Sequence, residues 1–317
     1  MLAPISLADI EAARDRIAGA AMRTPLVPLN VDDAPGEIYL KLENLQPIGS
    51  FKIRGAANVT GLADTSQLAA GVVTISAGNM AQGAAWTARR LGVPCTVIVP
   101  EHAPDAKLTA ITRLGAKIEK VPFETWWAMM ETRETGHDGL LVHPFADPAV
   151  MAGNGTIGLE LLEDLPDVDA VVIPFGGGGL SCGIASAIRA LKPETNIFAC
   201  EVGTAAPLAA SLKKGGPAEV KYTPSFVDGI GGKNVFTEMW PLVSSLLDGS
   251  LVASLDEVCT AVRLLMERNR IVAEGAGATS VATALSGQAG NGKIVCIVSG
   301  GNIDSEKLRL ILAGDPP

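Results

Sequence analysis

The sequence contains no block rich in lysine or arginine, and its 25 basic residues are outnumbered by 34 acidic ones, for a formal net charge of −9. This balance disfavours binding to nucleic acid or to an acidic membrane surface. No apolar run is long enough to span a bilayer, and the first residues lack the pattern of a signal peptide. We therefore expect a cytoplasmic protein whose partner is a small molecule.

Cysteine and histidine are also scarce. The five cysteines form no C-x-x-C pair and are widely scattered, which argues against a disulfide framework or a structural zinc site. The three histidines show no metal-ligand spacing. We therefore expect buried thiols and no metal site.

Glycine and apolar residues are plentiful, since the 317 residues include 35 glycines and 48% are hydrophobic. Strands are predicted at residues 39–42, 72–76, 95–99, 117–121, 140–143, 170–175, 197–202 and 294–299. Helices are predicted at residues 6–19, 81–91, 105–114, 123–135, 156–165, 180–191 and 255–268. Apolar strands that alternate with helices indicate an α/β fold, with parallel sheets covered on both faces.

The chain is expected to divide into two domains. Residues 1–70 and 148–317 would form a large, discontinuous domain, and residues 71–147 a small one. The predicted strand 140–143 ends at Pro144 and provides a crossing point between them. Little sequence follows Ile303, so we expect no C-terminal regulatory domain.

One lysine stands between an apolar aromatic residue and the predicted opening of a helix, in the stretch Gly49-Ser50-Phe51-Lys52-Ile53-Arg54-Gly55. A lysine in this setting can lose its solvation and its proton and become a nucleophilic amine that forms a Schiff base. Most lysines are solvated charges, so this stretch gains its meaning from three others.

Each of the three other stretches follows an apolar strand. Four glycines, Gly176, Gly177, Gly178 and Gly179, precede the helix expected from Leu180, and their N–H groups suit a phosphate. The alternative is a tightly packed turn. This loop is neither a P-loop nor a G-x-G-x-x-G motif.

The segment from Ser76 to Met80 opens a helix and could hold a substrate carboxylate. Ordinary helix capping by Ser76 or Asn79 is the competing interpretation. Ser299 could hydrogen-bond a heterocyclic nitrogen or be satisfied by the backbone, and Glu274 could serve a site or be a solvated turn residue. The aromatic and methionine side chains of residues 126–130 are interpreted as an apolar helix face.

Five segments in this order carry a resemblance that covers almost the whole chain: KLENLQPIGSFKIRGA, SAGNMAQGAAWTARRLG, HPFADPAVMAGNGTIGLELLED, FGGGGLSCGIA and VSGGNID. They resemble the fold-type II pyridoxal-phosphate enzymes, in particular the threonine/serine dehydratase (ammonia-lyase) and serine racemase group. The resemblance implies a tryptophan synthase beta-like fold with two parallel-rich sheets. It also implies pyridoxal 5'-phosphate as cofactor and a homodimer or homotetramer.

Carried over by position, the resemblance makes Lys52 the catalytic Schiff-base lysine, with Phe51 beside the cofactor. It assigns the remaining cofactor contacts to Asn79, Gly176, Gly177, Gly178, Gly179, Leu180, Glu274 and Ser299. It assigns the substrate carboxylate to Ser76, Ala77, Gly78, Asn79 and Met80.

The implied reaction is α,β-elimination of water from a β-hydroxy amino acid such as L-threonine or L-serine, which yields a 2-oxo acid and ammonia. In the racemases a second serine exchanges a proton with the opposite face of the substrate carbanion, and Ala77 stands at its position here. Proton transfer from one face alone favours elimination over racemisation. Phe145 is the residue that dehydratases carry at a position where a racemase has a polar side chain. Met80 replaces the histidine that commonly follows Ser-x-Gly-Asn, which leaves the substrate preference open. A divalent-cation site of some relatives would map to Glu201 and Pro207. Proline has no carboxylate to bind a cation, so we expect no such site here.

Several alternatives stay open on the sequence. They are a serine racemase, a 3-hydroxyaspartate dehydratase, a cysteine synthase-like β-replacement enzyme and a cofactor-binding protein without turnover. The preferred β-hydroxy amino acid is open as well.

Overall fold

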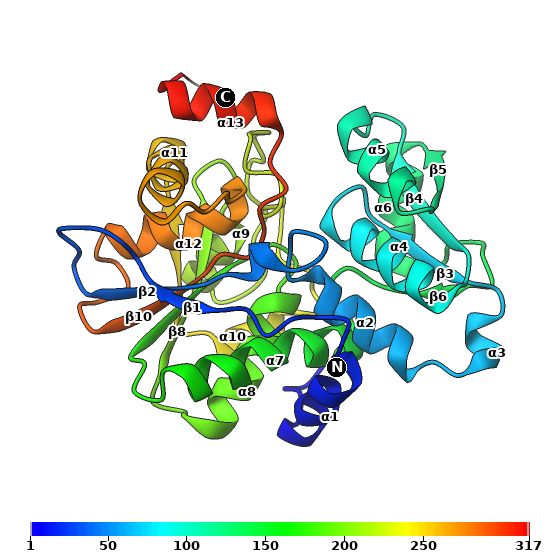
Figure 1. Ribbon diagram of the computed structural model, residues 1–317, viewed down its shortest axis with the longest axis horizontal. Helices are drawn as coiled ribbons and strands as arrows, with labels where there is room; N and C mark the ends of the chain where they lie inside the picture. The colour runs from blue at the N-terminus through cyan, green and yellow to red at the C-terminus, as the bar shows by residue number, and fades with distance from the viewer. Residues whose placement is uncertain (1, 316) are drawn as a thin grey trace.

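The chain forms two sheets, flanked by helices, in a computed structural model that describes residues 2–315 and 317 (Figure 1). The larger sheet has the strand order β1-β2-β10-β7-β8-β9, and the smaller has the order β5-β4-β3-β6. Only β1 pairs in the antiparallel sense, with β2. The predicted α/β class with parallel-rich sheets is therefore confirmed.

The strands are β1 (Leu26–Pro28), β2 (Glu37–Lys41), β3 (Val72–Ile75), β4 (Cys95–Pro100), β5 (Lys117–Val121), β6 (Leu140–Leu141), β7 (Ala170–Pro174), β8 (Asn196–Val202), β9 (Gly249–Ala253) and β10 (Lys293–Ile297). The helices are α1 (Leu7–Ile17), α2 (Lys52–Leu62), α3 (Thr65–Leu68), α4 (Asn79–Leu91), α5 (Asp105–Arg113), α6 (Phe123–Thr132), α7 (Pro148–Asp164), α8 (Gly179–Leu191), α9 (Pro207–Lys214), α10 (Trp240–Leu246), α11 (Leu255–Leu264), α12 (Gly275–Leu285) and α13 (Ser305–Ala313). A 3₁₀ turn covers Glu43–Leu45, and a π-helical turn covers Leu265–Asn269.

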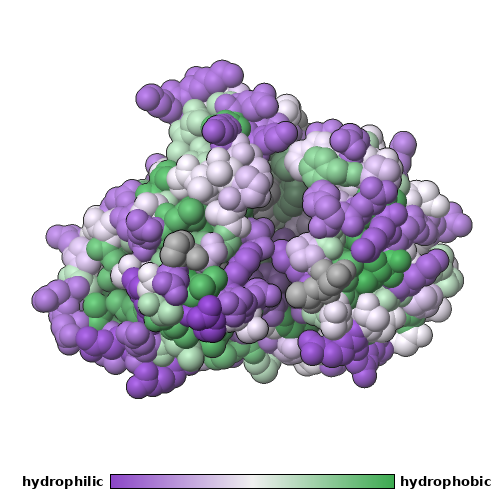
Figure 2. Space-filling view, turned by 90° about the horizontal axis from the view of Figure 1, so that it is seen from above, coloured by the Kyte–Doolittle hydropathy of each residue, from purple (hydrophilic) through white to green (hydrophobic). Residues whose placement is uncertain are grey.

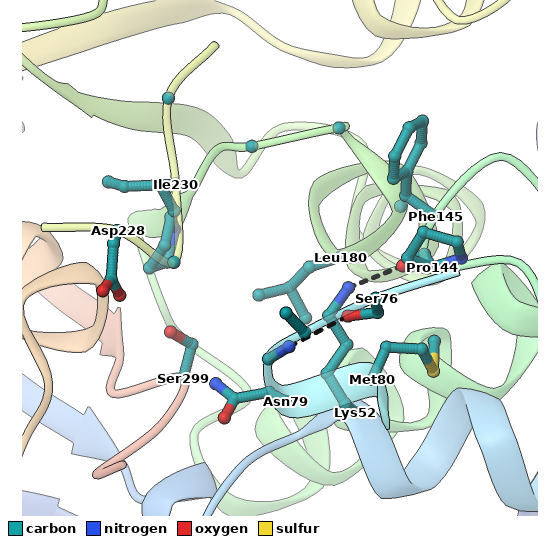
Figure 3. A pocket seen from close by; sticks show the side chains of 18 of the residues that line it. Lys52, Ser76, Asn79, Met80, Pro144, Phe145, Leu180, Asp228, Ile230 and Ser299 are labelled. Atoms are coloured by element: carbon teal, nitrogen blue, oxygen red, sulfur yellow. Dashed lines mark hydrogen bonds between the residues drawn. The ribbon is translucent and has the colours of Figure 1, made fainter. Parts of the chain in front are cut away.

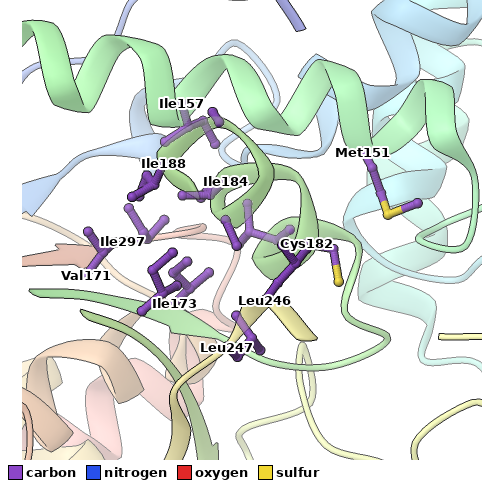
Figure 4. Packing of buried hydrophobic residues seen from close by; sticks show 14 of the residues in the cluster. Met151, Ile157, Val171, Ile173, Cys182, Ile184, Ile188, Leu246, Leu247 and Ile297 are labelled. Atoms are coloured by element: carbon purple, nitrogen blue, oxygen red, sulfur yellow. The ribbon is translucent and has the colours of Figure 1, made fainter. Parts of the chain in front are cut away.

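Both faces of each sheet are buried. Side chains of α1, α7, α8 and α10 pack on one face of the larger sheet, and Figure 4 shows part of this cluster, in which Ile184 and Ile188 of α8 point toward Ile173 of β7. Side chains of α11 and α12 cover the opposite face. Side chains of α4 and α5 cover one face of the smaller sheet, and those of α6 cover the other. Burial on both faces explains why the strands consist of nearly continuous apolar runs.

Helix α7 begins eight residues before the position that the sequence pattern predicts. Its N-cap is Asp147, whose side chain accepts the N–H of Ala149, and a proline occupies the first turn. The helical periodicity of α7 is obscured by Gly153, Gly155 and Gly158, which allow close packing on neighbouring helices. A Cβ added at Gly153 would lie 2.4 Å from the Arg54 carbonyl oxygen, and one at Gly155 would lie 2.9 Å from the Gly183 carbonyl oxygen. Glycine therefore lets α7 approach α2 and α8 closely.

Other predicted boundaries also differ. The predicted strand 140–143 contracts to β6, because the chain turns at Pro144. The predicted helix 255–268 changes to a π-helical turn after Leu264. The pattern predicted the opening of a helix at Lys52, where α2 begins, but not its extent. It missed β1, β9, α3 and the helices after β8 other than α11, most of which are short. Within residues 2–315 and 317, no helix has the length and apolar character needed to cross a membrane.

A network of buried charges joins α2 to α7. The Arg54 guanidinium donates to both oxygens of Glu43, each at 2.8 Å, and to those of Glu160 at 2.7 and 2.9 Å. Lys41 Nζ lies 2.7 Å from a Glu160 oxygen. The Thr24 hydroxyl donates to Glu43 at 2.6 Å. Two cations thus oppose two carboxylates, and each charge of this network has a counter-charge.

Replacing Arg54 should therefore destabilise the protein strongly. We expect Arg54→Met to lower the free energy of unfolding by about 3–5 kcal/mol, because it leaves the buried carboxylate of Glu43 without its ion-pair partner and Glu160 with Lys41 alone. Arg14→Met is the matched control, since Arg14 and Glu163 are 44% and 46% exposed, and it should cost less than about 1 kcal/mol. Urea unfolding of both variants measures the difference, and equal losses would contradict the role assigned to Arg54.

Candidate active site

The carboxyl ends of β3, β7 and β10 meet at a cavity of about 340 Å³ between the two sheets. Seen from above, the molecular surface is hollowed between its two parts (Figure 2). The cavity is lined by every residue for which the sequence predicts a role, namely Phe51, Lys52, Ser76, Ala77, Gly78, Asn79, Met80, Gly176, Gly177, Gly178, Gly179, Leu180, Glu274 and Ser299. Segments that are distant in the sequence thus share one site, whereas their individual roles stay predictions.

Lys52 is the first residue of α2, and its amine reaches into the cavity (Figure 3). Its Nζ donates a hydrogen bond to the Pro144 carbonyl oxygen at 2.5 Å and lies 5.1 Å from the centre of the Phe51 ring. Burial lowers the pKa of Lys52 to about 8, and the negative charge of Glu274 partly opposes this shift. A larger share of this amine is neutral near pH 7 than is usual for lysine, which suits a nucleophile or a general base.

Backbone hydrogen bonds hold the lysine loop against the end of β10. The Phe51 N–H donates to the Ser299 carbonyl at 3.0 Å, and the Gly301 N–H donates to the Gly49 carbonyl at 2.9 Å. Gly49 has φ of 73°, and a Cβ there would lie 2.6 Å from the Asn302 side-chain oxygen. Glycine is therefore required on both conformational and steric grounds. These bonds place Lys52 and Ser299 beside the same cavity.

The loop of four glycines connects β7 to the N-terminus of α8. Gly178 is the N-cap, with φ of 89°, which favours glycine. A Cβ at Gly177 would lie 2.3 Å from Cγ of Phe145. The first N–H groups of a helix have no carbonyl of the preceding turn to bond. The loop therefore offers N–H donors and the positive end of a helix dipole to an anion such as a phosphate.

A second helix N-terminus borders the cavity where β3 leads into α4. The N-cap is Gly78, which makes no side-chain capping bond, and the Gly78 N–H donates to the Ser76 hydroxyl at 3.2 Å. Capping of α4 by Asn79 or Ser76, the competing interpretation, is therefore wrong. The Asn79 amide instead donates to Glu274 at 2.9 Å and accepts from the Asn302 amide at 2.8 Å. Asn302 thus orients the Asn79 amide, with its NH₂ group toward Glu274.

Glu274 is the half-buried N-cap residue of α12. Burial raises the pKa of this carboxyl to about 7, whereas the hydrogen bond from Asn79 opposes the shift. The interpretation of Glu274 as a solvated turn residue is wrong, because its carboxylate accepts the Asn79 amide and lines the cavity. Near neutral pH the carboxyl exchanges its proton readily, so it can buffer the charge of a neighbouring group.

Further residues of the cavity had no predicted part in it. Lys107 of α5 lies 2.9 Å from Asp228, and both line the cavity. Trp126 and Met130 line it too, although the pattern assigns them to an ordinary apolar helix face. No sequence signal identifies such residues, because only the packing of α5 and α6 against the smaller sheet directs them to the site.

Possible metal ligands do not gather within the part of the chain that the structure describes: it contains no group of three or more histidine, cysteine, aspartate or glutamate side chains that could hold an ion. Glu201, which the resemblance relates to a cation site, accepts the N–H groups of Leu208 and Ala209, each at 2.8 Å. Its carboxylate thus binds the N-terminus of α9.

The chain is similar in sequence to curated ammonia-lyases. An L-threonine ammonia-lyase of Thermotoga maritima is 41% identical over 315 residues, which cover 97% of this chain and 78% of that protein. A protein of Staphylococcus aureus, "L-threonine dehydratase catabolic TdcB", is 39% identical over 318 residues, which cover 97% of this chain and 92% of that protein. The similarity therefore extends over nearly the whole sequence.

Solved structures resemble the chain to the same extent. A maize serine racemase superposes with a TM-score of 0.90 at 31% identity, covering 98% of both chains. The processed form of threonine deaminase isoform 2 from Solanum lycopersicum superposes with a TM-score of 0.87 at 32% identity, covering 97% of this chain and 87% of that one. The two sheets and the cavity between them therefore belong to a fold that these enzymes share.

The lowered pKa of Lys52 predicts a distinctive pH dependence. In protein freed of any bound aldehyde, we expect reductive methylation of Lys52 by formaldehyde to rise about tenfold per pH unit below pH 7 and to level off above pH 8, as the amine becomes neutral. Exposed lysines should become more reactive up to about pH 10. Mass spectrometry of the peptides separates the two groups, and a Lys52 profile that matches that of exposed lysines would contradict the prediction.

The cavity offers what a phosphate-bearing aldehyde requires: an amine with a lowered pKa and a glycine loop that any larger side chain would obstruct. A model of the family described as "Pyridoxal-phosphate dependent enzyme" matches residues 17–300. This match spans the lysine stretch, the serine and glycine loops, Glu274 and Ser299. The chain therefore belongs to the pyridoxal-phosphate dependent enzyme family.

Proposed function

We propose that this chain is a pyridoxal-phosphate dependent ammonia-lyase. It converts a β-hydroxy amino acid such as L-threonine or L-serine to a 2-oxo acid and ammonia. The observation that carries the proposal is one half-buried lysine of lowered pKa that shares a single cavity with two helix N-termini. The identity of about 40% to L-threonine ammonia-lyases supports it.

The residues around the cavity suit the parts of the cofactor. Gly176, Gly177, Gly178 and Gly179 with the Leu180 N–H would hold the phosphate, and the Lys52 amine would hold the aldehyde carbon. The Ser299 hydroxyl would meet the ring nitrogen, and the Asn79 amide the ring hydroxyl, with Phe51 packed beside them. Glu274 would stand near the ring hydroxyl, because it accepts the Asn79 amide.

Substrate would bind through its carboxylate, at Ser76, Ala77, Gly78, Asn79 and Met80. The N-terminus of α4 supplies N–H donors and a favourable dipole for that charge. The site would therefore place the Cα of the amino acid between this loop and Lys52.

Lys52 would act as the general base that removes the Cα proton. Its burial keeps a useful fraction of the amine neutral at physiological pH. When bound, pyridoxal phosphate supplies the electron sink that makes this proton acidic. Ala77 carries no hydroxyl that could return a proton from the opposite face, so the loss of the β-hydroxyl is favoured over racemisation.

The alternatives differ in their products. A racemase would convert L-serine to D-serine without releasing ammonia, and a 3-hydroxyaspartate dehydratase would release oxaloacetate. A β-replacement enzyme would form a thiol amino acid when sulfide is added, and a binding protein would release nothing. Reaction mixtures with L-serine, L-3-hydroxyaspartate and added sulfide therefore separate the alternatives. Chiral amino-acid analysis detects D-serine and a thiol amino acid, and 2-oxo acid analysis detects oxaloacetate.

We further propose that residues 1–70 and 148–317 form the large domain and residues 71–147 the small one. The division of the strands between the two sheets supports these bounds. We also propose a cytoplasmic homodimer or homotetramer. The five free thiols, four of them buried, suit a reducing compartment. Sedimentation of the holoenzyme tests the oligomeric state.

Removing the Lys52 amine should abolish the reaction. We expect Lys52→Ala to lower 2-oxo acid release from L-threonine by at least about 10³-fold, because nucleophile and base are lost together. Lys120→Ala is the matched control, since Lys120 is exposed on β5, and it should retain normal turnover. The assay couples 2-oxo acid to its reduction by NADH. Full turnover by Lys52→Ala would refute the mechanism.

The glycine loop gives a separate prediction about the phosphate. We expect Gly177→Ala to weaken pyridoxal phosphate binding by at least about tenfold, or about 1.4 kcal/mol, because the added methyl group would overlap the Phe145 ring. Gly216→Ala is the control, since a Cβ there meets no described atom within 4 Å. Equilibrium dialysis measures the affinities, and unchanged binding by Gly177→Ala would contradict the cradle.

A further inference from the structure

One wall of the cavity is apolar and partly aromatic. Trp126 and Met130 contribute to it from α6, Met80 from α4, and Phe145 from the turn after β6. Figure 3 shows Phe145 and Met80 on the same side of the Lys52 amine. Asn79 and Ser299, which are proposed to bind the cofactor, lie on the other side. The Phe145 ring also packs on Gly177 of the glycine loop, so the wall runs from the proposed phosphate site to the side of the amine away from Asn79 and Ser299.

Hydrogen bonds hold this wall in place. The Trp126 indole N–H donates to the Ile98 carbonyl at 3.2 Å. Buried His143, whose pKa burial lowers to about 4, is neutral at physiological pH. Its Nδ1 accepts the Ala146 N–H at 3.0 Å, and its Nε2 faces the Met130 carbonyl at 3.3 Å. The turn that carries Phe145 and the end of α6 are thereby tied together.

Aromatic contacts add to this rigidity. The Phe145 ring centre lies 4.8 Å from that of His143 and 4.7 Å from that of Phe236. Phe236 in turn stacks on Trp127 at 5.8 Å. A fixed apolar surface distinguishes ligands by shape and polarity better than a mobile one does.

The position of the substrate directs its β-substituent toward this wall. Lys52 Nζ, the proposed base at Cα, lies 2.5 Å from the carbonyl oxygen of Pro144, the residue before Phe145. The carboxylate is proposed to lie at the Ser76 loop, and the opposite side is assigned to the cofactor. The remaining space beside Cα is bordered by Phe145, Met80 and the α6 side chains.

The charged groups of the cavity disfavour a second carboxylate. Besides Lys52, its described lining contains one other cationic side chain, Lys107, and no arginine. Lys107 is paired with Asp228 at 2.9 Å, and Glu274 lies nearby in the same lining. A carboxylate on the β-carbon would face the apolar rings without a cationic partner, while the acidic Asp228 and Glu274 border the same cavity from the side of Asn79 and Ser299. Its desolvation would therefore not be compensated.

We propose, on the basis of the ammonia-lyase function above, that Trp126 and Phe145 select β-hydroxy amino acids with an apolar β-substituent, including an aryl group, and reject a β-carboxylate. For a 3-arylserine, the Cα–H and Cβ–O bonds break, the Cα–Cβ double bond forms, and water leaves. A proton then moves from nitrogen to Cβ, which turns the enamine into an imine, and water replaces nitrogen at Cα to yield a 3-aryl-2-oxopropanoate and ammonia. The reaction requires no oxidant or reductant.

The first test compares kcat/KM of the holoenzyme for L-threonine, L-serine, L-3-phenylserine and L-3-hydroxyaspartate. We expect phenylserine to match or exceed serine, and hydroxyaspartate to fall at least about 100-fold below threonine, because a buried unpaired charge discriminates strongly. Hydroxyaspartate turnover within tenfold of threonine turnover, or phenylserine at least 100-fold below serine, would overturn the proposal.

Variants at the two tryptophans test the assignment of the wall. Trp126→Ala should lower kcat/KM for phenylserine at least about tenfold more than for threonine, because the lost surface contacts only the larger substituent. Trp126→Arg should raise hydroxyaspartate relative to phenylserine at least about tenfold, since it supplies a bidentate partner. Trp86→Ala is the control, since its ring packs near Arg90 of α4 outside the cavity lining. Unchanged ratios in both Trp126 variants would refute the role of Trp126.

Binding of amino acids without a β-hydroxyl provides a readout that does not depend on turnover. Calorimetry should show that L-phenylalanine binds the holoenzyme at least about tenfold more tightly than L-aspartate, and that Trp126→Ala removes this preference. If no β-hydroxy amino acid is turned over, the proposed function fails, whereas this preference alone would still support the apolar wall. Equal affinities, or tighter binding of L-aspartate, would overturn it.

Discussion

The bidentate contacts of the Arg54 guanidinium with Glu43 and Glu160 fix the part of the molecule on which the site depends. Arg54 lies two residues beyond Lys52 in α2, so these contacts hold the helix that presents the amine. Glu160 belongs to α7, which packs closely on α2 through Gly153. Because an unpaired charge is very unfavourable in the interior, the network has few alternative arrangements. The lysine is therefore oriented by groups that never reach the cavity.

The site brings an amine and a carboxyl toward similar acidity by the same physical cause. Burial disfavours the charged form of each, which lowers the pKa of Lys52 to about 8 and raises that of Glu274 to about 7. Both groups therefore titrate near physiological pH, where proton transfer requires little driving force. The helix N-termini at Gly178 and Gly78 supply positive potential for anions without adding titratable groups. Charge at this site is thus controlled by burial and by backbone dipoles.

Local patterns predicted the elements whose periodicity reflects burial, and they failed where packing reverses a local preference. The apolar runs of β3, β7 and β10 were recognised because both faces of each sheet are covered. The start of α7 was missed because glycine disfavours helices locally, although Gly155 and Gly158 permit close contact with α8. Periodicity assigns Trp126 to an ordinary helix face, since it does not reveal which part of that face borders a cavity.

The sequence by itself determined which groups could serve a site: the amine of Lys52 at the opening of a helix and, at strand ends, the donor-rich loop from Gly176 to Gly179 and the hydroxyl of Ser299. These groups could be recognised because strand ends in parallel sheets gather at one edge. Only the tertiary structure decided that Asn302 orients the Asn79 amide, and that Trp126 borders the cavity. Those relations join elements far apart in the sequence. The pKa values also depended on tertiary structure, because desolvation exists only once the two sheets enclose the cavity.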